Sequence, residues 1–415
     1  MSEIEAARRI FFLTFPLYEM SRMRQRMLLH PDAKLNTLVH RRNLSRPSDR
    51  VITTPNTDTL YSSAWLDLAG NPVRLTIPVM GSRYHSVQLM HAFSDAFAVL
   101  RNDASTARQF LIVGPDWNGQ ASPHEEVVRS PTRDAWLVAR TFVRGPGDLA
   151  EAQQMQGAYT IDGDKRAPGE SKEKIPARPN GGQFLAVVDA ALARGPLPEA
   201  QAGRVGGFSG MMAIRVNGDT RFQINPAMRA VFDRNLNTFY DEAGQAFEQS
   251  GSLKNGWRYP SPNIAEFGHD DLYRSAMALG GLAALPINEA INPLTTQDSA
   301  GVPLDGSSHY RLSIPGNVPV DAFWSLTLYE YDGAGRWFLY PNPIDRHAAN
   351  STASDIEPQA DGTILLHISN TQPAGRANWL PAPRGHFLLV LRAYRPRSSF
   401  IDGSFHLPAV ERIDA

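Results

Sequence analysis

Short segments in which apolar and polar residues alternate dominate two stretches of the chain, Val51–Ile161 and the part from Tyr310 onward. Within the first stretch, Tyr84–Met90 alternates and places Val87 and Leu89 on one face of a strand. Most of these segments are bounded by Gly, Pro or Asn, which favour turns. Many short strands separated by turn residues are typical of a β-sandwich or barrel. We therefore predict a β-rich domain at each end of the chain.

Apolar residues follow helical spacing before the first β-rich stretch and between the two. Residues 4–30 carry apolar side chains at mostly three- and four-residue steps, which indicates an N-terminal helix. Gln183–Arg194, Asn225–Gln249 and Asp271–Leu285 are predicted as three further helices. The pattern therefore predicts a mainly β fold with a helical insert, in the α+β class.

This pattern divides the chain into four segments. We expect an N-terminal helix at 1–36, a first β-sandwich domain at 37–165, a helical linking region at 166–295 and a second β-sandwich domain at 296–415. Inside the first domain, Ala69-Gly70-Asn71-Pro72 separates two strand-like segments and predicts a β-hairpin there.

Composition narrows the class of partner. The 41 basic and 42 acidic residues nearly cancel, so no global field favours nucleic acid or an anionic membrane, and a small molecule is the expected partner. No stretch approaches 18 uncharged apolar residues and no signal peptide is seen, so we expect a cytoplasmic protein. The absence of cysteine excludes disulfides, thiolate metal sites and a cysteine nucleophile. Association into a homo-oligomer is left open.

The common cofactor and nucleophile motifs are missing. The sequence has no phosphate-binding loop and no dinucleotide-binding Gly-x-Gly-x-x-Gly after a strand, so no cofactor is expected. Gly207-Phe208-Ser209-Gly210 lacks the spacing of a nucleophile elbow. No histidine pair has the spacing of a helical metal site, although a divalent metal ion bound through oxygen ligands is compatible with the sequence.

Several strings of residues resemble a pair of bacterial domains of unknown function. The first of these domains is number 1254. Its motifs resemble three strings of this chain, Asn56–Asp67, Arg83–Leu89 and Arg140-Thr141. Its usual partner is domain number 1214. The motifs of that domain resemble four later strings of this chain, Asn255–Tyr259, Val320–Thr327, Pro341–Arg346 and Asn378–Pro383. The resemblance implies two jelly-roll-like β-sandwich domains joined by a helical segment. It implies no reaction.

One string departs from this resemblance. After Gln88 the family string usually resembles Leu-Leu-Asp-x-x-Thr-Asn, whereas this chain has Leu89-Met90-His91-Ala92-Phe93-Ser94-Asp95. The change is compatible with a specialised active site or with drift. If a turn brings His91 and Asp95 together, an Asp-oriented histidine is a suitable general base near neutral pH. A structural His–Asp contact is the alternative.

Candidate catalytic residues come from the first domain. Asn56 and Asp58 lie two apart, so in an extended segment their oxygens point to one side and can hold a cation or a substrate hydroxyl. A loop closed by side-chain-to-backbone hydrogen bonds is the alternative. We expect Asp58 or His91 as base, Tyr61 or Tyr84 as acid or hydroxyl donor, and Arg83 or Arg346 as anion holder.

Substrate-binding candidates are spread over both domains. Tyr84, Ser86, Gln88 and Met90 share one strand face, which can line a ligand cavity. The set comprises Asn56, Gln88, Asp95, Arg140, Trp257, Trp324, Asn342, Arg346 and Trp379. For the tryptophans, packing in the core is favoured over a stacking platform for ligand. For Asn342 and Arg346, a structural loop is as well supported as a site.

Three classes of function follow. The leading hypothesis is a small-molecule enzyme of hydrolase or lyase type that uses acid–base chemistry, without a cofactor or with a single divalent metal ion. The second is a non-catalytic module that binds carbohydrate or another small molecule. The third is a structural protein in which these motifs only determine the fold.

Overall fold

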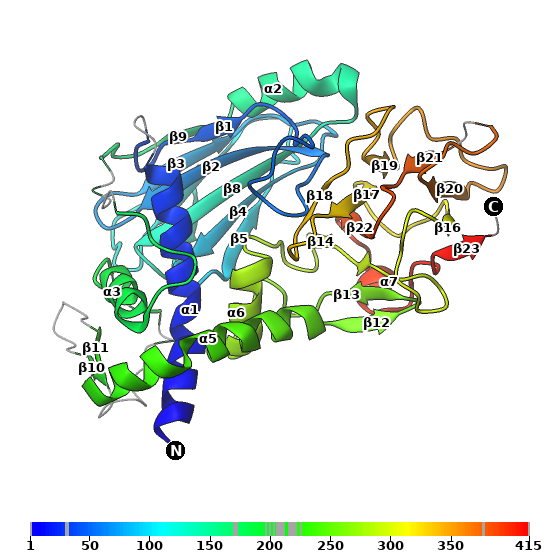
Figure 1. Ribbon diagram of the computed structural model, residues 1–415. Helices are drawn as coiled ribbons and strands as arrows, with labels where there is room; N and C mark the ends of the chain where they lie inside the picture. Colours follow the sequence, from blue (N-terminus) through cyan, green and yellow to red (C-terminus); the bar gives the residue numbers. More distant parts are fainter. Residues whose placement is uncertain are drawn as a thin grey trace.

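The computed structural model describes residues 2–29, 33–167, 169, 173–195, 197–198, 201, 204, 212–214, 222–224, 226–375 and 378–413. It confirms a mostly β, two-domain architecture with several helices packed beside the first domain (Figure 1). In the described part of the chain, no helix has both the length and the apolar character needed to cross a membrane.

The first domain consists of two sheets. The five-stranded sheet has the order β1-β2-β8-β4-β5 and contains β1 (Val39–Arg41), β2 (Thr59–Asp67), β4 (His85–His91), β5 (Ala96–Leu100) and β8 (Asp134–Phe142). The four-stranded sheet has the order β7-β6-β3-β9 and contains β3 (Val73–Ile77), β6 (Arg108–Val113), β7 (Glu126–Arg129) and β9 (Thr160–Asp162). The short helices η1 (Pro146–Asp148) and α2 (Leu149–Gly157) follow β8.

The two sheets share one hydrophobic core. Val87 and Leu89 of β4 are buried in it together with Leu75 of β3 and Phe110 of β6, as the alternation of β4 predicted. The predicted hairpin at residues 69–72 is wrong, because β2 pairs with β1 and β8 whereas β3 pairs with β6 and β9. The turn instead carries the chain from one sheet to the other, which turn residues permit equally well.

Four helices form a second core beside the first domain. They are α1 (Glu3–Leu28), α3 (Gly181–Leu192), α5 (Pro226–Gln249) and α6 (Asp271–Gly280), and a small hairpin is formed by β10 (Met212–Ile214) and β11 (Phe222–Ile224). Aromatic rings pack between α1, α3 and α5, for example Phe11 on Phe184 with ring centroids 5.4 Å apart. All four helices lie where helical spacing predicted them, but α6 ends at Gly280, five residues before the predicted end at Leu285. The predicted first residue of α5, Asn225, lies outside the described residues.

The second domain also has two sheets. The larger one has the order β12-β13-β15-β22-β17-β18, with β14 paired to β22 and β19 paired to β17. Its strands are β12 (Ser252–Lys254), β13 (Trp257–Tyr259), β14 (Ala290–Ile291), β15 (Leu294–Thr295), β17 (Trp324–Tyr331), β18 (Trp337–Leu339), β19 (Ala348–Asn350) and β22 (Phe387–Tyr394). The smaller sheet, in the order β21-β20-β16-β23, contains β16 (His309–Ile314), β20 (Ile364–Ser369), β21 (Trp379–Pro381) and β23 (Glu411–Ile413), and α7 (Ser398–Ile401) follows β22.

The two domains are in direct contact through the segment that precedes β2. Tyr329 of β17 donates a hydrogen bond from its hydroxyl to the Pro55 carbonyl at 2.8 Å, and Arg392 of β22 donates to the Thr54 carbonyl at 2.8 Å. Beside this contact, the rings of Phe142 and Phe323 stack with centroids 3.7 Å apart. The interface therefore joins β2 and β8 of the first domain to β17 and β22 of the second.

Candidate functional site

The outer face of the five-stranded sheet is polar at its centre. Tyr61 of β2 lies opposite Arg140 of β8, and Arg140 lies opposite Ser86 of β4. Tyr84 and Gln88 lie two residues before and after Ser86, so they share this face. The intervening residues of β4 point into the sandwich core. We call these five residues the polar row, and its β4 members are those that the alternation predicted.

Asp58 lies where the polar row meets the second domain. Its carboxylate accepts hydrogen bonds from the Ser325 hydroxyl and, at 3.0 Å, from the Asn350 side-chain amide. Its own backbone N–H donates to Asn56 Oδ1 at 2.6 Å, which is the loop closure given above as the alternative for this segment. Burial raises the pKa of Asp58, while the hydrogen bond from Ser325 and the charge of Arg392 oppose the rise. Both carboxylate oxygens of Asp58 are therefore occupied by hydrogen bonds that join the two domains.

Tyr394 connects the Asp58 segment to the polar row. Its hydroxyl accepts a hydrogen bond from Asn56 Nδ2 at 2.6 Å, and its ring centroid lies 4.8 Å from that of Tyr84. Burial raises the pKa of Tyr394, and the neighbouring Tyr61 and Asp58 raise it further. Tyr394 is therefore held as a neutral phenol at physiological pH.

Arg140 and Gln88 hold a connecting segment against the sheet. Arg140 Nη1 donates to Gln88 Oε1 at 3.0 Å and Nη2 donates to the Ala283 carbonyl at 2.7 Å. Gln88 Nε2 donates to the Ala284 carbonyl at 2.7 Å. We call residues 281–288, which lead from α6 to β14, the strap. Ala283 adopts φ +67°, a left-handed conformation that costs a non-glycine residue about 1 kcal/mol, so these hydrogen bonds hold a strained backbone.

Glu289 follows the strap and contacts Tyr84. The Tyr84 hydroxyl donates to Glu289 Oε1 at 2.8 Å and lies 3.3 Å from Ser86 Oγ. Glu289 Oε2 accepts a hydrogen bond from Arg101, yet the Glu289 residue as a whole is only 3% exposed. Burial raises the pKa of Glu289 above its ordinary value, although Arg101 and Tyr84 act against the rise. Burial and the nearby Glu289 also raise the pKa of Tyr84 well above 10, so Tyr84 stays a hydroxyl donor.

A solvent-reachable cavity of about 170 Å³ opens beside Glu289, the residue that accepts the hydrogen bond from Tyr84. It is lined by Val99, Arg101, Glu266, Pro286, Asn288 and Glu289. The side chain of Arg101 is one-third exposed, so it presents positive charge to this space as well as to Glu289. A small molecule in the cavity would therefore meet a carboxyl group with raised proton affinity and a guanidinium.

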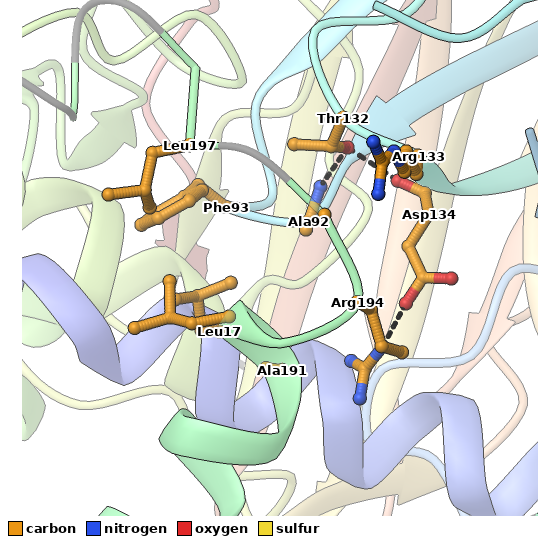
Figure 2. A pocket seen from close by; sticks show the side chains of 11 residues that line it. Leu17, Ala92, Phe93, Thr132, Arg133, Asp134, Ala191, Arg194 and Leu197 are labelled. Carbon is orange, nitrogen blue, oxygen red and sulfur yellow. Dashed lines mark hydrogen bonds and ion pairs between the residues drawn. The ribbon is translucent and has the colours of Figure 1, made fainter. Parts of the chain in front are cut away.

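A second hollow lies between α1, α3 and the loops at the ends of β4 and β8 (Figure 2). Leu17, Phe93 and Leu197 form its apolar side, and Arg194 is paired with Asp134 at its polar side. Its volume of about 20 Å³ is room for a water molecule and not for a substrate. We therefore place the candidate site at the larger cavity, whose wall includes Glu289, the hydrogen-bond partner of Tyr84.

Arg83 lies outside the polar row although it is close to it in sequence. Its side chain is buried and pairs with Asp148, with Nη2 and Oδ1 2.8 Å apart, and Nη2 also lies 3.1 Å from Glu151 Oε1. Nη1 donates to the Phe142 carbonyl at 2.8 Å. These bonds fasten η1 and α2 to the sheet, and the guanidinium has a structural role.

His91 and Asp95 are near one another but do not form the catalytic pair considered from the sequence. Asp95 accepts from Arg274 Nε at 2.7 Å and from the Phe267 backbone N–H at 3.0 Å, while His91 Nε2 is 3.8 Å from Asp95 Oδ2. Burial lowers the pKa of His91 to about 4. The histidine is therefore neutral and enclosed at neutral pH, and Asp95 serves to anchor α6 through Arg274.

The three candidate tryptophans pack in the second domain. Trp257 Nε1 donates to the Pro408 carbonyl at 2.8 Å and Trp379 Nε1 donates to the Ser369 carbonyl at 3.0 Å. Trp324 is 4% exposed and belongs to the core of the domain. These rings have no face available to a ligand, which agrees with the packing interpretation.

Asn342 and Arg346 stabilise their own loop. Asn342 Oδ1 accepts from the Arg346 backbone N–H at 3.0 Å. The Arg346 guanidinium donates to the Trp379 carbonyl at 2.9 Å and to Asp355 Oδ2 at 2.6 Å. This is the structural alternative given for the loop, and it lies away from the polar row.

Five residues of the site were missed from the sequence, namely Arg101, Glu289, Ser325, Arg392 and Tyr394. A signal was available for Arg392, because a lone arginine in the otherwise apolar strand Phe387–Tyr394 requires a buried polar environment. For Glu289 and Arg101, which lie 188 residues apart and meet in the fold, we find no local signal.

Metal binding has little support in the described residues. They contain no group of three or more His, Asp or Glu side chains arranged to hold an ion. Asp58 and Glu289 are the carboxyl groups nearest the polar row, and hydrogen-bond donors occupy both oxygens of each.

Family models match the chain in two places. Residues 35–163 match the model described as "Protein of unknown function (DUF1254)", and residues 289–398 match "Protein of unknown function (DUF1214)". The polar row falls in the first match, and Glu289, Ser325, Arg392 and Tyr394 fall in the second. No curated protein matches the chain.

Solved structures resemble the fold. The VPA0106 protein from Vibrio parahaemolyticus has a TM-score of 0.76 with 20% sequence identity, and the match covers 100% of both chains. A putative uncharacterized protein from Burkholderia cenocepacia has a TM-score of 0.49 with 13% identity, covering 96% of this chain and 87% of the other. The first likeness shows that the two-domain fold with its helices recurs as a unit.

Proposed function

The chain belongs to the proteins that carry DUF1254 and DUF1214 in tandem, and we propose that it is an enzyme acting on a small molecule by acid–base chemistry, of hydrolase or lyase type. One observation supports this proposal above others. A buried carboxyl group, Glu289, lies in the wall of a cavity of about 170 Å³ with its Oε1 hydrogen-bonded to the Tyr84 hydroxyl. The pair combines residues from both family matches, so neither domain alone contains it.

Glu289 has the properties of a general base. Its raised pKa gives the carboxylate a higher proton affinity than an exposed glutamate, and a base is most effective when its pKa approaches the working pH. The charge of Arg101 opposes this rise in the pKa of Glu289. Glu289 would take a proton from a substrate, or from a water molecule, in the cavity.

Tyr84 and Arg101 complete the proposed arrangement. Tyr84 orients the carboxylate through its hydroxyl and stays protonated, because its own pKa lies well above 10. Arg101 can stabilise negative charge that develops on the substrate, as a fixed cation at the cavity wall. Asp58 is assigned a positioning role, since it holds the two domains in the register that brings Glu289 to Tyr84.

The non-catalytic alternatives differ in what they require. A carbohydrate-binding module needs exposed aromatic rings, and Trp257, Trp324 and Trp379 are at most 4% exposed. A purely structural protein requires only the interdomain hydrogen bonds. The cavity next to a carboxyl group of raised pKa favours the enzyme.

Substitution of the pair tests the proposal. The wild-type chain is incubated with a panel of small esters, amides, lactones and hydroxy acids, and with a small-molecule cell extract, and products are followed by mass spectrometry. Glu289→Gln should lower turnover of any substrate found by roughly 10²- to 10⁴-fold, as loss of a general base does. Tyr84→Phe should lower it by about tenfold, because one hydrogen bond to a charged group is lost.

The matched control is Glu330→Gln, which removes a glutamate that pairs with Arg50 at the surface. It should leave turnover unchanged. Circular dichroism and thermal unfolding establish that each variant is folded. Full activity in folded Glu289→Gln, or no product from the wild type with any panel member or extract, would contradict the proposal.

A further inference from the structure

Two arginines of the interdomain interface are buried without an ion-pair partner. Arg140 is 6% exposed and Arg392 is 8% exposed. Among the residues that the structure describes, neither guanidinium has a carboxylate oxygen within 4.0 Å. Their side-chain hydrogen bonds go to neutral groups, which are Gln88 and the Ala283 carbonyl for Arg140, and Thr327 and the Thr54 carbonyl for Arg392.

This arrangement is unusual within the chain itself. Arg83 and Arg274 are buried to a similar degree, and each pairs with two carboxylates. Removing a charge from water without a counter-ion costs several kcal/mol, so buried guanidiniums are normally paired. The exceptions at Arg140 and Arg392 require an explanation.

Tyr61 lies beside Arg140 and acts electrostatically on Arg392. The Arg140 guanidinium carbon is 5.5 Å from the centroid of the Tyr61 ring, and Tyr61 is also among the groups that raise the pKa of Arg392. Tyr61 is only partly buried, and its hydroxyl has no hydrogen-bond partner in the described part of the chain. Among the described residues, its hydroxyl is therefore a free donor beside the Arg140 guanidinium.

The charge balance of the interface is positive. The charge of Glu289 is balanced by its ion pair with Arg101. Arg140 and Arg392 add two positive charges, against which Asp58 supplies at most one negative charge. Asp58 is already bound by Ser325 and Asn350. A ligand with one negative charge would restore neutrality.

We propose that a small organic monocarboxylate binds beside Tyr61, with its charge balanced by Arg140 and Arg392 and one oxygen accepting a hydrogen bond from the Tyr61 hydroxyl. This inference rests on the proposed function, since it names the substrate class of the same interface. Ser86 lies opposite Arg140 and 3.3 Å from the Tyr84 hydroxyl, so the polar row leads from this anion site to Glu289.

Binding to the wild-type chain is measured by thermal shift and isothermal titration calorimetry at low ionic strength. The probes are acetate, propionate and benzoate, each with its neutral amide, and inorganic phosphate. A ligand that binds the folded state at 100 times its Kd stabilises that state by about 2.7 kcal/mol, which both methods detect. At least one carboxylate should give saturable stabilisation, and its amide should bind at least tenfold more weakly.

Variants locate the site. Arg140→Gln should weaken carboxylate binding at least tenfold. Because this change also disturbs the strap, Tyr61→Phe is the second variant. It removes a hydroxyl that bonds nothing in the described structure, so it should fold as the wild type does and bind carboxylate about fivefold more weakly. Arg311→Gln, which removes a surface arginine paired with Glu411, is the matched control and should bind normally.

The outcomes separate this inference from the proposed function. Glu289→Gln should retain carboxylate binding, because Glu289 does not form the anion site, whereas it should lose turnover. Phosphate binding without carboxylate binding, equal binding of acids and amides, no saturable binding by any probe, or unchanged binding in both Tyr61→Phe and folded Arg140→Gln would each overturn the inference. None of these results depends on turnover.

Discussion

Three buried carboxyl groups of this chain are distinguished by their partners. Asp58 accepts from two neutral donors, Asp95 is paired with a fully buried arginine, and Glu289 accepts from one phenol and one arginine that is one-third exposed. Of these three, Glu289 alone lines the 170 Å³ cavity. The chemistry of a carboxyl group here is therefore decided by its surroundings and not by its residue type.

His91 provides a prediction at the scale of one residue. Its pKa is lowered from 6.5 to about 4, so the folded state binds its proton less tightly than the unfolded state does. Stability contributed by neutral His91 is complete above pH 6.5 and is lost as the pH falls toward 4. Relative to His91→Gln, the wild type should lose up to about 3 kcal/mol of unfolding free energy over this window.

Urea unfolding of both proteins at pH 7.0, 5.5 and 4.5 measures this difference. The comparison between the two proteins cancels the titration of the other groups. A constant difference across the three pH values would show that His91 is accessible to protons in the folded state, and it would reopen a general-base role for this residue.

At the scale of the element, a buried charged contact ties α6 to the first domain. Arg274 of α6 is fully buried and pairs with Asp95, which lies in the turn between β4 and β5, and with Asp271. The strap and Glu289 follow directly from α6. The turn after β4 therefore sets where the candidate base is placed.

Asp95→Asn should lower the free energy of unfolding by about 3 to 5 kcal/mol, because breaking one side of a buried ion pair leaves charge uncompensated. Asp321→Asn is the control, since Asp321 pairs with Arg397 at the surface and such pairs contribute about 1 kcal/mol or less. Chemical denaturation measures both. Equal losses in the two variants would refute the assigned role of Asp95.

At the scale of the whole molecule, the interface joins the two domains and contains residues of the proposed site. Asp58 from the first domain meets Ser325 and Asn350 from the second, and Arg392 meets the Thr54 carbonyl. Neither domain can present the polar row and Glu289 together without this contact.

Asp58→Ala should separate the unfolding of the two domains. The change leaves the donors of Ser325 and Asn350 unsatisfied in a buried interface, at a cost of about 2 to 4 kcal/mol. Differential scanning calorimetry should then resolve two transitions where the wild type has one. Asp162→Ala, at a side chain that is 84% exposed, is the control and should keep the wild-type profile. Identical profiles for the two variants would refute the coupling.

The sequence by itself determined the local structure and the family. Alternation in Tyr84–Met90 gave the strand and its polar face, and helical spacing gave the four helices, because both signals depend on side-chain periods that a single element shows. The same local information failed at residues 69–72, since a turn does not record which sheet receives the chain.

Only the tertiary structure decided which polar side chains are free to act. Arg83, Asp95 and Arg346 looked as available as Tyr84 or Arg140 in the sequence, yet ion pairs with residues elsewhere in the fold occupy them. Glu289 became a candidate base because folding buries it against Tyr84, 205 residues away in the chain. Proton affinity depends on desolvation and on neighbouring charges, and these exist only after distant segments pack together.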